Sequence, residues 1–231
     1  MSKRKHKLII VSHPDDESLF FAGLMLSEKS THWTVVCATD GNADGHGHKR
    51  MKQFSTATKL LGAKKIICLD LQDKFNKRLD QKTLKEKLSE LSATWTSQPD
   101  EVYTHGPIGE YGHPHHQDIS LAVHNHFHKK SPVYSIAHNC KPDRVIKLSA
   151  TDFRMKTKVL SNIYFSETER FINFVPATAV ECFVKLKLRE VQNIYNHIAL
   201  NKKISPRELD KYLWFLPYFK SMKIKSKSRP F

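Results

Sequence analysis

The chain has 231 residues, of which 39% are hydrophobic, and a formal net charge of +15 at pH 7. This length fits one α/β domain with a substantial core, and no apolar stretch is long enough to cross a bilayer. Residues 1–12 carry a charge of +4 and residues 183–231 carry +9, which leaves only +2 for the rest. Because the charge lies at the two ends, it does not indicate the basic groove of a nucleic-acid enzyme, and no nucleic-acid partner is expected.

Cysteine spacing and the first residues indicate the compartment. The four cysteines are widely scattered and form no CxxC pair, which argues against a disulfide framework. The basic start, residues 1–7, is followed by a short apolar run, Leu8 to Val11, that is too short for the core of a signal peptide. We therefore expect a cytoplasmic protein.

Strand-like and helix-like segments alternate along the first 140 residues. The patterns predict strands over 7–12, 33–39, 65–69, 101–105 and 133–138, and helices over roughly 16–29, 48–61, 81–94 and 116–129. This alternation predicts an α/β fold with a doubly wound, mostly parallel, Rossmann-like sheet and helices on both faces. In such sheets ligands bind at the carboxyl ends of the strands.

The C-terminal third is predicted to be helical. Residues 179–200 are predicted to form one long helix, and Ser205-Pro206-Arg207-Glu208 has the N-cap, N1 proline and capping-box glutamate of another. We expect a single domain over residues 1–231 that ends in a basic tail at about 220–231. Aromatic residues at 214–219 precede this tail. They fit a segment docked on the domain, and they also fit peripheral contact with the inner membrane surface.

The first predicted strand runs into the motif SHPDDE, residues 12–17. His13 and the adjacent acids Asp15 and Asp16 are residue types that ligate metals, and one of the two acids could bind a cation while the other moves a proton. The alternative is that these acids only cap the next helix and interact favourably with its positive end.

A second histidine cluster makes a metal site the better interpretation. The stretch THGPIGEYGHPHHQDI, residues 104–119, follows the fourth strand and contains His113, His115 and His116 in front of a helix. One of these histidines together with His13 and Asp16 would give a 2-His-1-carboxylate ligand set. Such a set suits catalytic zinc, with coordination positions left for water and substrate.

The two motifs together resemble the LmbE-like, or PIG-L, family of zinc-dependent de-N-acetylases, in which HPDD(E) ends a strand and a later loop carries GxxGHPxH. SHPDDE and GEYGHPHH match both elements, ATDGNADG resembles the loop after the family's second strand, and the likeness covers about residues 7–140. The resemblance implies removal of an acetyl group from an N-acetylated amino sugar, such as an N-acetylglucosamine conjugate, in small-molecule or lipid-linked form.

The resemblance also assigns roles to individual residues. It implies that zinc is bound by His13, Asp16 and His116, that Asp15 is the general base for the metal-bound water, and that His113 stabilises the developing oxyanion. It further implies that Arg50 contacts the substrate.

Two points stay open at this stage. Many relatives have an acid at the position of His115, and this departure leaves the protonation of His113 open. The second is a different class of function: a non-enzymatic binding module for polyanions or lipid surfaces with a vestigial metal site. The intact set of candidate residues favours the enzyme.

Overall fold

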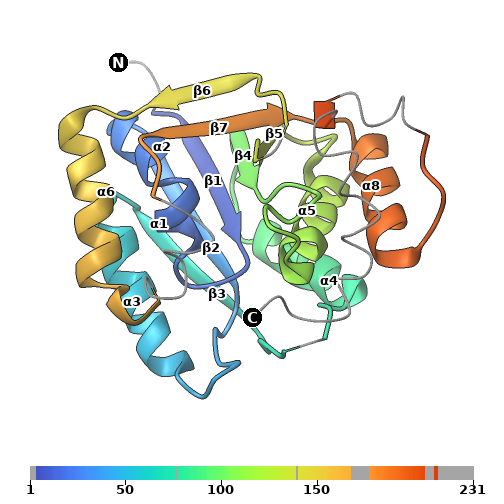
Figure 1. The fold of residues 1–231 in the computed structure, drawn as a ribbon, viewed down its shortest axis with the longest axis horizontal. Coiled ribbons are helices and arrows are strands. Elements are labelled where there is room, and N and C mark those ends of the chain that lie inside the picture. Colours follow the sequence, from blue (N-terminus) through green and yellow to red (C-terminus); the bar gives the residue numbers. More distant parts are fainter. Residues whose placement is uncertain (1–3, 76, 139, 168–176, 206–210, 213–231) are drawn as a thin grey trace. The chain divides into compact units, whose positions relative to one another are not determined.

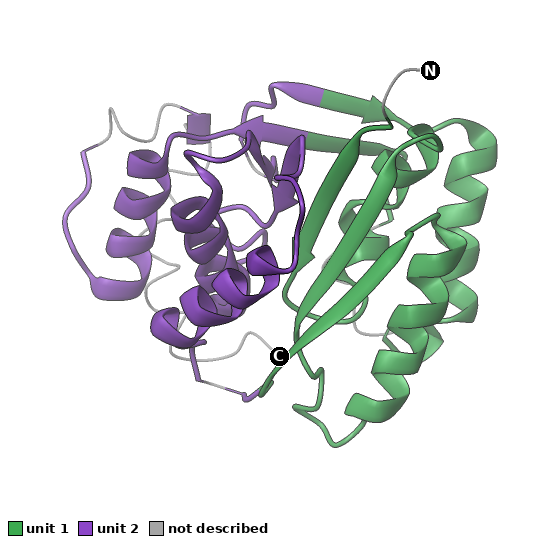
Figure 2. Ribbon diagram, turned by 180° about the vertical axis from the view of Figure 1, so that it is seen from behind, with its two compact units in different colours: residues 1–73, 145–182 green, residues 74–144, 183–231 purple. Residues whose placement is uncertain are grey.

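The fold of the chain is given by a computed structural model that describes residues 4–75, 77–138, 140–167, 177–205 and 211–212 (Figure 1). By its internal contacts the chain divides into two compact units (Figure 2). Unit 1 consists of residues 1–73 and 145–182, and unit 2 consists of residues 74–144 and 183–231. The chain therefore leaves unit 1, returns to it and leaves it again. The prediction of a single domain stays a prediction.

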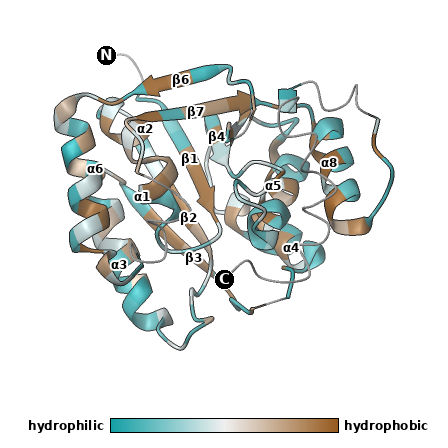
Figure 3. Ribbon diagram, viewed as in Figure 1, coloured by the Kyte–Doolittle hydropathy of each residue, from teal (hydrophilic) through white to brown (hydrophobic). Residues whose placement is uncertain are grey.

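Unit 1 contains three parallel strands in the order β3-β2-β1: β1 (His6–Val11), β2 (His32–Thr39) and β3 (Lys65–Leu71). Its helices are α1 (Asp16–Phe20), α2 (Ala22–Ser27), α3 (Gly47–Leu60) and α6 (Ala150–Asn162). The apolar side chains from Leu8 to Val11 are fully buried, as expected for a parallel strand covered on both faces. Figure 3 shows hydrophobic residues along most of β1, whereas much of α3 is hydrophilic.

Unit 2 contains the parallel pair β4 (Glu101–Thr104) and β5 (Val133–Ile136). Its helices are α4 (Gln81–Ala93), α5 (Pro114–Phe127) and α8 (Leu188–Leu200). Two further strands, β6 (Arg144–Lys147) and β7 (Val180–Lys185), lie where the chain passes between the units, and residues 183–185 of β7 pair antiparallel with β5. The predicted α/β class with a mostly parallel sheet flanked by helices is confirmed.

Two predicted helices were wrong in extent. The stretch 179–200 begins as the strand β7, in which Val180, Phe183 and Val184 are residues that favour a pleated surface, and α8 starts only at Leu188. Glu190 marks that start, because its carboxylate accepts a hydrogen bond from the backbone N–H of Lys187 at 2.7 Å.

The stretch 16–29 forms two short helices rather than one. The break lies at Phe21. In the first turn of α2, backbone N–H groups donate hydrogen bonds to a residue outside the helix. The backbone N–H groups of Gly23 and Leu24 donate to the carboxylate of Glu181 at 2.8 and 2.9 Å. A distant acid therefore caps α2 and allows it to start separately from α1.

Some predictions fall on residues outside the described part of the chain. They are the basic tail at 220–231, the aromatic residues at 214–219 and most of the helix that was expected to begin at Ser205. Among the helices of the described residues, none is both long and apolar enough to cross a membrane. The four cysteines, all in the described part, form no disulfide.

Candidate active site

The HPDD motif forms the sharp turn between β1 and α1 in unit 1. Asp15 is the residue before the helix, and its backbone has a φ of +128°, a conformation that side chains other than glycine rarely adopt. Such a conformation typically costs about 1–3 kcal/mol and persists where surrounding contacts enforce it. The carbonyl of Asp15 accepts hydrogen bonds from the N–H groups of Ser18 and Leu19 at 2.9 and 3.0 Å. The turn is thus strained at the residue predicted to move a proton.

His13 and Asp16 lie together in this turn. The backbone N–H of His13 donates to Oδ2 of Asp16 at 2.8 Å, and the ring Nδ1 of His13 lies 3.4 Å from the same oxygen. Both side chains are buried. Zinc binds histidine nitrogen and carboxylate oxygen at about 2.0–2.2 Å, so two such ligands in a tetrahedral site lie roughly 3.3–3.6 Å apart. The spacing of His13 and Asp16 fits this requirement.

Arg50, on α3, binds Asp15. Its Nη2 donates to Oδ2 of Asp15 at 2.6 Å and to the carbonyl of Pro14 at 3.1 Å, and Nη1 donates to the carbonyl of Gly41 at 3.2 Å. Burial raises the pKa of Asp15 well above its usual range, although the guanidinium of Arg50 opposes the rise. A raised carboxyl pKa makes Asp15 a stronger proton acceptor in its ionised form.

The loop after β2 must approach this turn closely. Gly41 has a φ of +62°, and a Cβ at this position would lie 2.8 Å from the ring of Pro14. The glycine is therefore needed for both its backbone conformation and the space it leaves. This observation gives a physical role to the ATDGNADG stretch.

Two acids near Arg50 were missed by the sequence reasoning. Oδ2 of Asp73, just beyond the end of β3, lies 3.9 Å from Nη1 of Arg50, and its Oδ1 lies 3.8 Å from Nε2 of His13. Oε2 of Glu167 lies 3.8 Å from Nε of Arg50. Asp73 could have been found, because it follows a strand at the end where ligands collect. Glu167 lies outside any recognisable motif.

The histidine loop in unit 2 is organised around a buried acid, Glu110. Its Oε2 lies 3.0 Å from Nδ1 of His105 and is also bonded to Nδ1 of His116, while its Oε1 accepts the N–H of Gly106 at 2.7 Å. Burial by itself raises the pKa of Glu110. Attraction to His105 and His116, with their hydrogen bonds, outweighs burial and lowers the pKa to about 2. Glu110 is therefore ionised at neutral pH.

The backbone of this loop explains its glycines. Gly109, Glu110 and Gly112 all have positive φ angles, of 77°, 55° and 96°. A Cβ at Gly109 would lie 2.5 Å from the carbonyl oxygen of His113, so the loop cannot fold this way with another residue there. The tight turn directs the carboxylate of Glu110 back toward the histidines.

Glu110 fixes how His116 can act. The hydrogen bond to a carboxylate makes Nδ1 the donor of the neutral ring, which places the lone pair on Nε2. A carboxylate that holds one nitrogen of a histidine is the usual support for a zinc ligand. The ring of His105, the other histidine bonded to Glu110, stacks on that of His116 with the ring centroids 3.8 Å apart. Neither Glu110 nor His105 was predicted from the sequence as a site residue.

His113 begins α5 as its N-cap. Its Nδ1 accepts the backbone N–H of His115 at 3.2 Å, so this nitrogen carries no proton and the ring, in this geometry, is the neutral Nε2–H form. The ring stacks on His116 with centroids 4.7 Å apart. His115, at the position of the expected acid, instead bonds the carbonyl of Lys77 through Nε2 at 2.7 Å. A neutral His113 can still donate a hydrogen bond from Nε2.

The structure thus brings the predicted residues together within each unit. Unit 1 holds His13, Asp15, Asp16 and Arg50 around one turn. Unit 2 holds His113 and His116 at the start of one helix. The predicted ligands His13, Asp16 and His116 are buried, and buried histidine and aspartate side chains among the described residues are compatible with a metal site.

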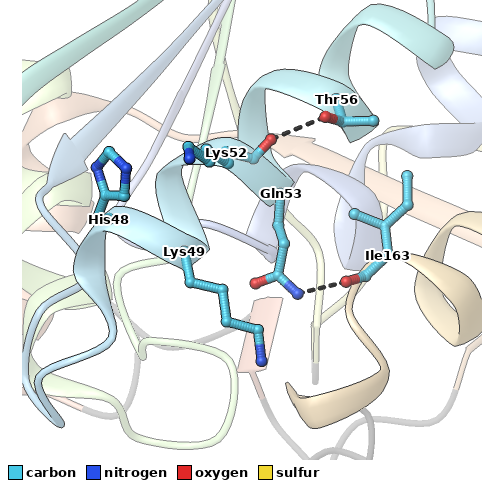
Figure 4. A pocket seen from close by; sticks show the side chains of 6 residues that line it. All are labelled: His48, Lys49, Lys52, Gln53, Thr56 and Ile163. Atoms are coloured by element: carbon cyan, nitrogen blue, oxygen red, sulfur yellow. Dashed lines mark hydrogen bonds between the residues drawn. The ribbon is translucent and has the colours of Figure 1, made fainter.

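A shallow hollow on unit 1 is separate from these residues. It measures about 430 Å³ and lies along one face of α3, lined by His48, Lys49, Lys52, Gln53, Thr56 and, after α6, Ile163 (Figure 4). None of the predicted ligands or catalytic residues lines it. It therefore does not replace the HPDD turn as the candidate site.

Comparison with known families decides the relationship. The family model for PIG-L, described as GlcNAc-PI de-N-acetylase, matches residues 8–127, which include the HPDD turn, Arg50 and the histidine loop. The chain belongs to the PIG-L family.

Individual relatives of the chain are distant. The chain is similar to an uncharacterised protein of Acanthamoeba polyphaga mimivirus, with 31% identity over 52% of this chain and 56% of the relative. It is also similar to a probable N-acetylglucosaminyl-phosphatidylinositol de-N-acetylase of Schizosaccharomyces pombe, with 29% identity over 47% of this chain and 46% of the relative. The chain spans about half the length of these curated relatives.

A solved structure extends the likeness to most of the chain. The N,N'-diacetylchitobiose deacetylase of Pyrococcus horikoshii matches with a TM-score of 0.59 and 20% identity, over 80% of this chain and 85% of that protein. At this identity the match establishes the shared fold. It supports the predicted architecture beyond the residues covered by the family model.

Proposed function

We propose that this protein is a zinc-dependent hydrolase that removes the acetyl group from an N-acetylated amino sugar, such as an N-acetylglucosamine conjugate. The observation that carries the proposal is the HPDD turn of a PIG-L family member. In it, a buried carboxyl, Asp15, stands directly beside a His13–Asp16 pair with ligand spacing. In this arrangement Asp16 binds the metal, and the adjacent Asp15 transfers the proton.

The proposed zinc ligands are His13, Asp16 and His116. His13 and Asp16 have the spacing of two ligands on one ion, and His116 has the tautomer and carboxylate support of a third. When bound, zinc lowers the pKa of a water ligand to about 7 and polarises a carbonyl oxygen.

Asp15 is the proposed general base. Its raised pKa suits a group that takes a proton from water and returns it to the departing amine. The hydrogen bond from Arg50 fixes one carboxylate oxygen, and the other is then the acceptor that this role needs. His113 is the proposed stabiliser of the oxyanion, because its Nε2–H can donate a hydrogen bond to the negative oxygen that develops.

The decisive experiment measures metal content and amine release together. Purified protein is assayed for released amine on free N-acetylglucosamine, a nucleotide sugar, an N-acetylated oligosaccharide and an N-acetylglucosaminyl lipid. We expect one of these substrate classes to be turned over, chelation to abolish the activity, and zinc to restore it. Full activity in metal-free protein would contradict the zinc hydrolase. Zinc binding without turnover of any class would favour the non-enzymatic binding module instead.

A further inference from the structure

Glu17, the last acid of the HPDDE motif, is buried and holds the backbone of Asp15. It is 0% exposed, and its Oε2 accepts the N–H of Asp15 at 3.0 Å. This is the N–H of the residue whose φ is +128°. Glu17 therefore fixes the peptide that carries the proposed base.

The other oxygen of Glu17 is held by a residue far away in the sequence. Tyr164, also 0% exposed, donates its hydroxyl to Oε1 of Glu17 at 2.8 Å, and Ser18 donates to the same oxygen at 2.6 Å. Tyr164 follows α6 and lies beyond residues 8–127, the part that matches the family model. It is not part of either sequence motif.

The segment that carries Tyr164, residues 163–167, is itself anchored to α3. Gln53 donates to the carbonyl of Ile163, as Figure 4 shows, and Lys49 donates to Ser166 at 3.4 Å. At the end of the segment, Glu167 lies 3.8 Å from Arg50, which is the other partner of Asp15. The segment thus reaches Asp15 by two routes, through Glu17 to its backbone and through Arg50 to its carboxylate.

We propose that the segment 163–167 positions the general base, with Tyr164 and Glu17 as the positioning residues that hold the strained backbone of Asp15. The proposal rests on the proposed function for the role of Asp15. Its structural part, a hydrogen-bonded relay from Tyr164 through Glu17 to the Asp15 N–H, does not. A relay of this kind keeps the backbone that carries a catalytic carboxylate in one conformation, because each member holds the next in place by a hydrogen bond.

The test compares Tyr164→Phe, Glu17→Gln and Glu17→Ala with wild type. We expect Tyr164→Phe to lower kcat about tenfold, as for the loss of one hydrogen bond, with KM and zinc content near wild type. Glu17→Ala is expected to lower kcat further, and Glu17→Gln to recover part of the loss because its amide oxygen can still accept the Asp15 N–H. The matched control is Tyr103→Phe, which removes a phenol that donates to a glutamate, Glu101, in unit 2. We expect it to leave kcat unchanged.

A second readout does not depend on activity. Amide hydrogen exchange at Asp15, followed by NMR on ¹⁵N-labelled protein, should be at least about tenfold faster in Glu17→Ala, while the amides of β1 keep their protection. Unchanged exchange at Asp15 in Glu17→Ala would overturn the relay. Loss of zinc in Tyr164→Phe, or a lowered melting temperature with kcat unchanged, would overturn the positioning role. If wild type turns over no substrate, the proposed function fails, and the exchange data still decide the relay.

Discussion

The turn after β1 and the loop after β4 are built around opposite charges. In unit 1 a cation, Arg50, is buried against the carboxylates of Asp15, Asp73 and Glu167. In unit 2 a carboxylate, Glu110, is buried between the imidazoles of His105 and His116. The turn after β1 thus surrounds a cation with carboxylates, and the loop after β4 surrounds a carboxylate with imidazoles.

This inversion explains why the two loops suit different tasks. A guanidinium among acids favours the ionised form of each carboxylate, so one can ligate a metal while another accepts a proton. A carboxylate between imidazoles fixes ring orientation and tautomer, which is what a histidine ligand needs. The base is therefore expected in the acid-rich loop, and the histidine loop is expected to bind and to stabilise charge.

The strongest test of the division between proton transfer and metal binding replaces each of the two adjacent acids in turn. Asp15→Asn is expected to keep zinc and to lose about 10²–10⁴-fold in kcat, because an amide cannot accept the proton of water. Asp16→Asn is expected to lower both zinc occupancy and rate, because it removes an anionic ligand. The measurements are zinc content by metal analysis and kcat on the substrate identified by the amine-release screen.

Two outcomes would break the division between the acids. If Asp15→Asn lost its zinc, the roles of the two aspartates would be exchanged. If Asp15→Asn kept most of its rate, the base would lie elsewhere. Glu28→Gln is a suitable control, because Glu28 is an acid of unit 1 that pairs with Lys7 away from the HPDD turn.

Much of this arrangement could be predicted from sequence because it is local. HPDD and GHPHH each place several functional side chains within a few residues, and the strand before each motif fixes the end of the sheet at which it lies. The residues that hold these motif side chains in place are either far away in the sequence or lie in stretches without a recognisable motif. Tyr164 is 147 residues from Glu17, and nothing in its neighbourhood marks it.

The missed strand β7 has a related cause. Residues 179–200 read as one helix because the apolar residues of β7 run directly into the amphipathic pattern of α8. The pairing of Phe183 with Ile136 of β5 decides the matter. Such long-range pairing overrides local propensity and is not visible in the segment itself.

The histidine loop can be tested through its central acid. Glu110→Gln is expected to weaken zinc binding about 10–100-fold, the usual effect of losing the carboxylate behind a histidine ligand. Zinc affinity is measured by competition with a chelator of known affinity. Glu101→Gln, a glutamate of the same unit that bonds Tyr103, is the control. Unchanged zinc affinity in Glu110→Gln would mean that His116 does not depend on this acid.

The acid-rich turn can be tested through its central cation. Arg50→Lys keeps the positive charge but cannot reproduce the bonds to Asp15, Pro14 and Gly41 together. We expect a loss of about 1–2 kcal/mol in the free energy of unfolding, or a melting temperature lower by about 2–8 °C. The same variant tests the predicted substrate contact, since a rise in KM would indicate contact with substrate. A lower kcat at constant KM would indicate that Arg50 acts on Asp15 alone.

Another buried histidine, His124, extends the comparison to a ring held without a carboxylate. It lies two turns after His116 on α5, with Nδ1 bonded to the carbonyl of Ser120 at 2.7 Å and Nε2 3.4 Å from the hydroxyl of Ser135. Burial lowers the pKa of His124 to about 4, the Ser120 carbonyl opposes this, and the nearby His128 adds to it. His124 is therefore neutral in the folded protein at neutral pH.

The smallest expected effect follows from the sign of that shift. Because the pKa of His124 is about 4 in the folded protein and about 6.5 when unfolded, its neutral form favours folding. The contribution is complete above about pH 6.5 and is lost as the pH falls toward 4, with a slope of at most about 1.4 kcal/mol per pH unit. His124→Gln should flatten the acid side of the stability curve between these values, measured by urea unfolding at each pH. The control His48→Gln replaces an exposed histidine and should leave the slope unchanged. An unaltered slope in His124→Gln would show that this ring is not held neutral by burial.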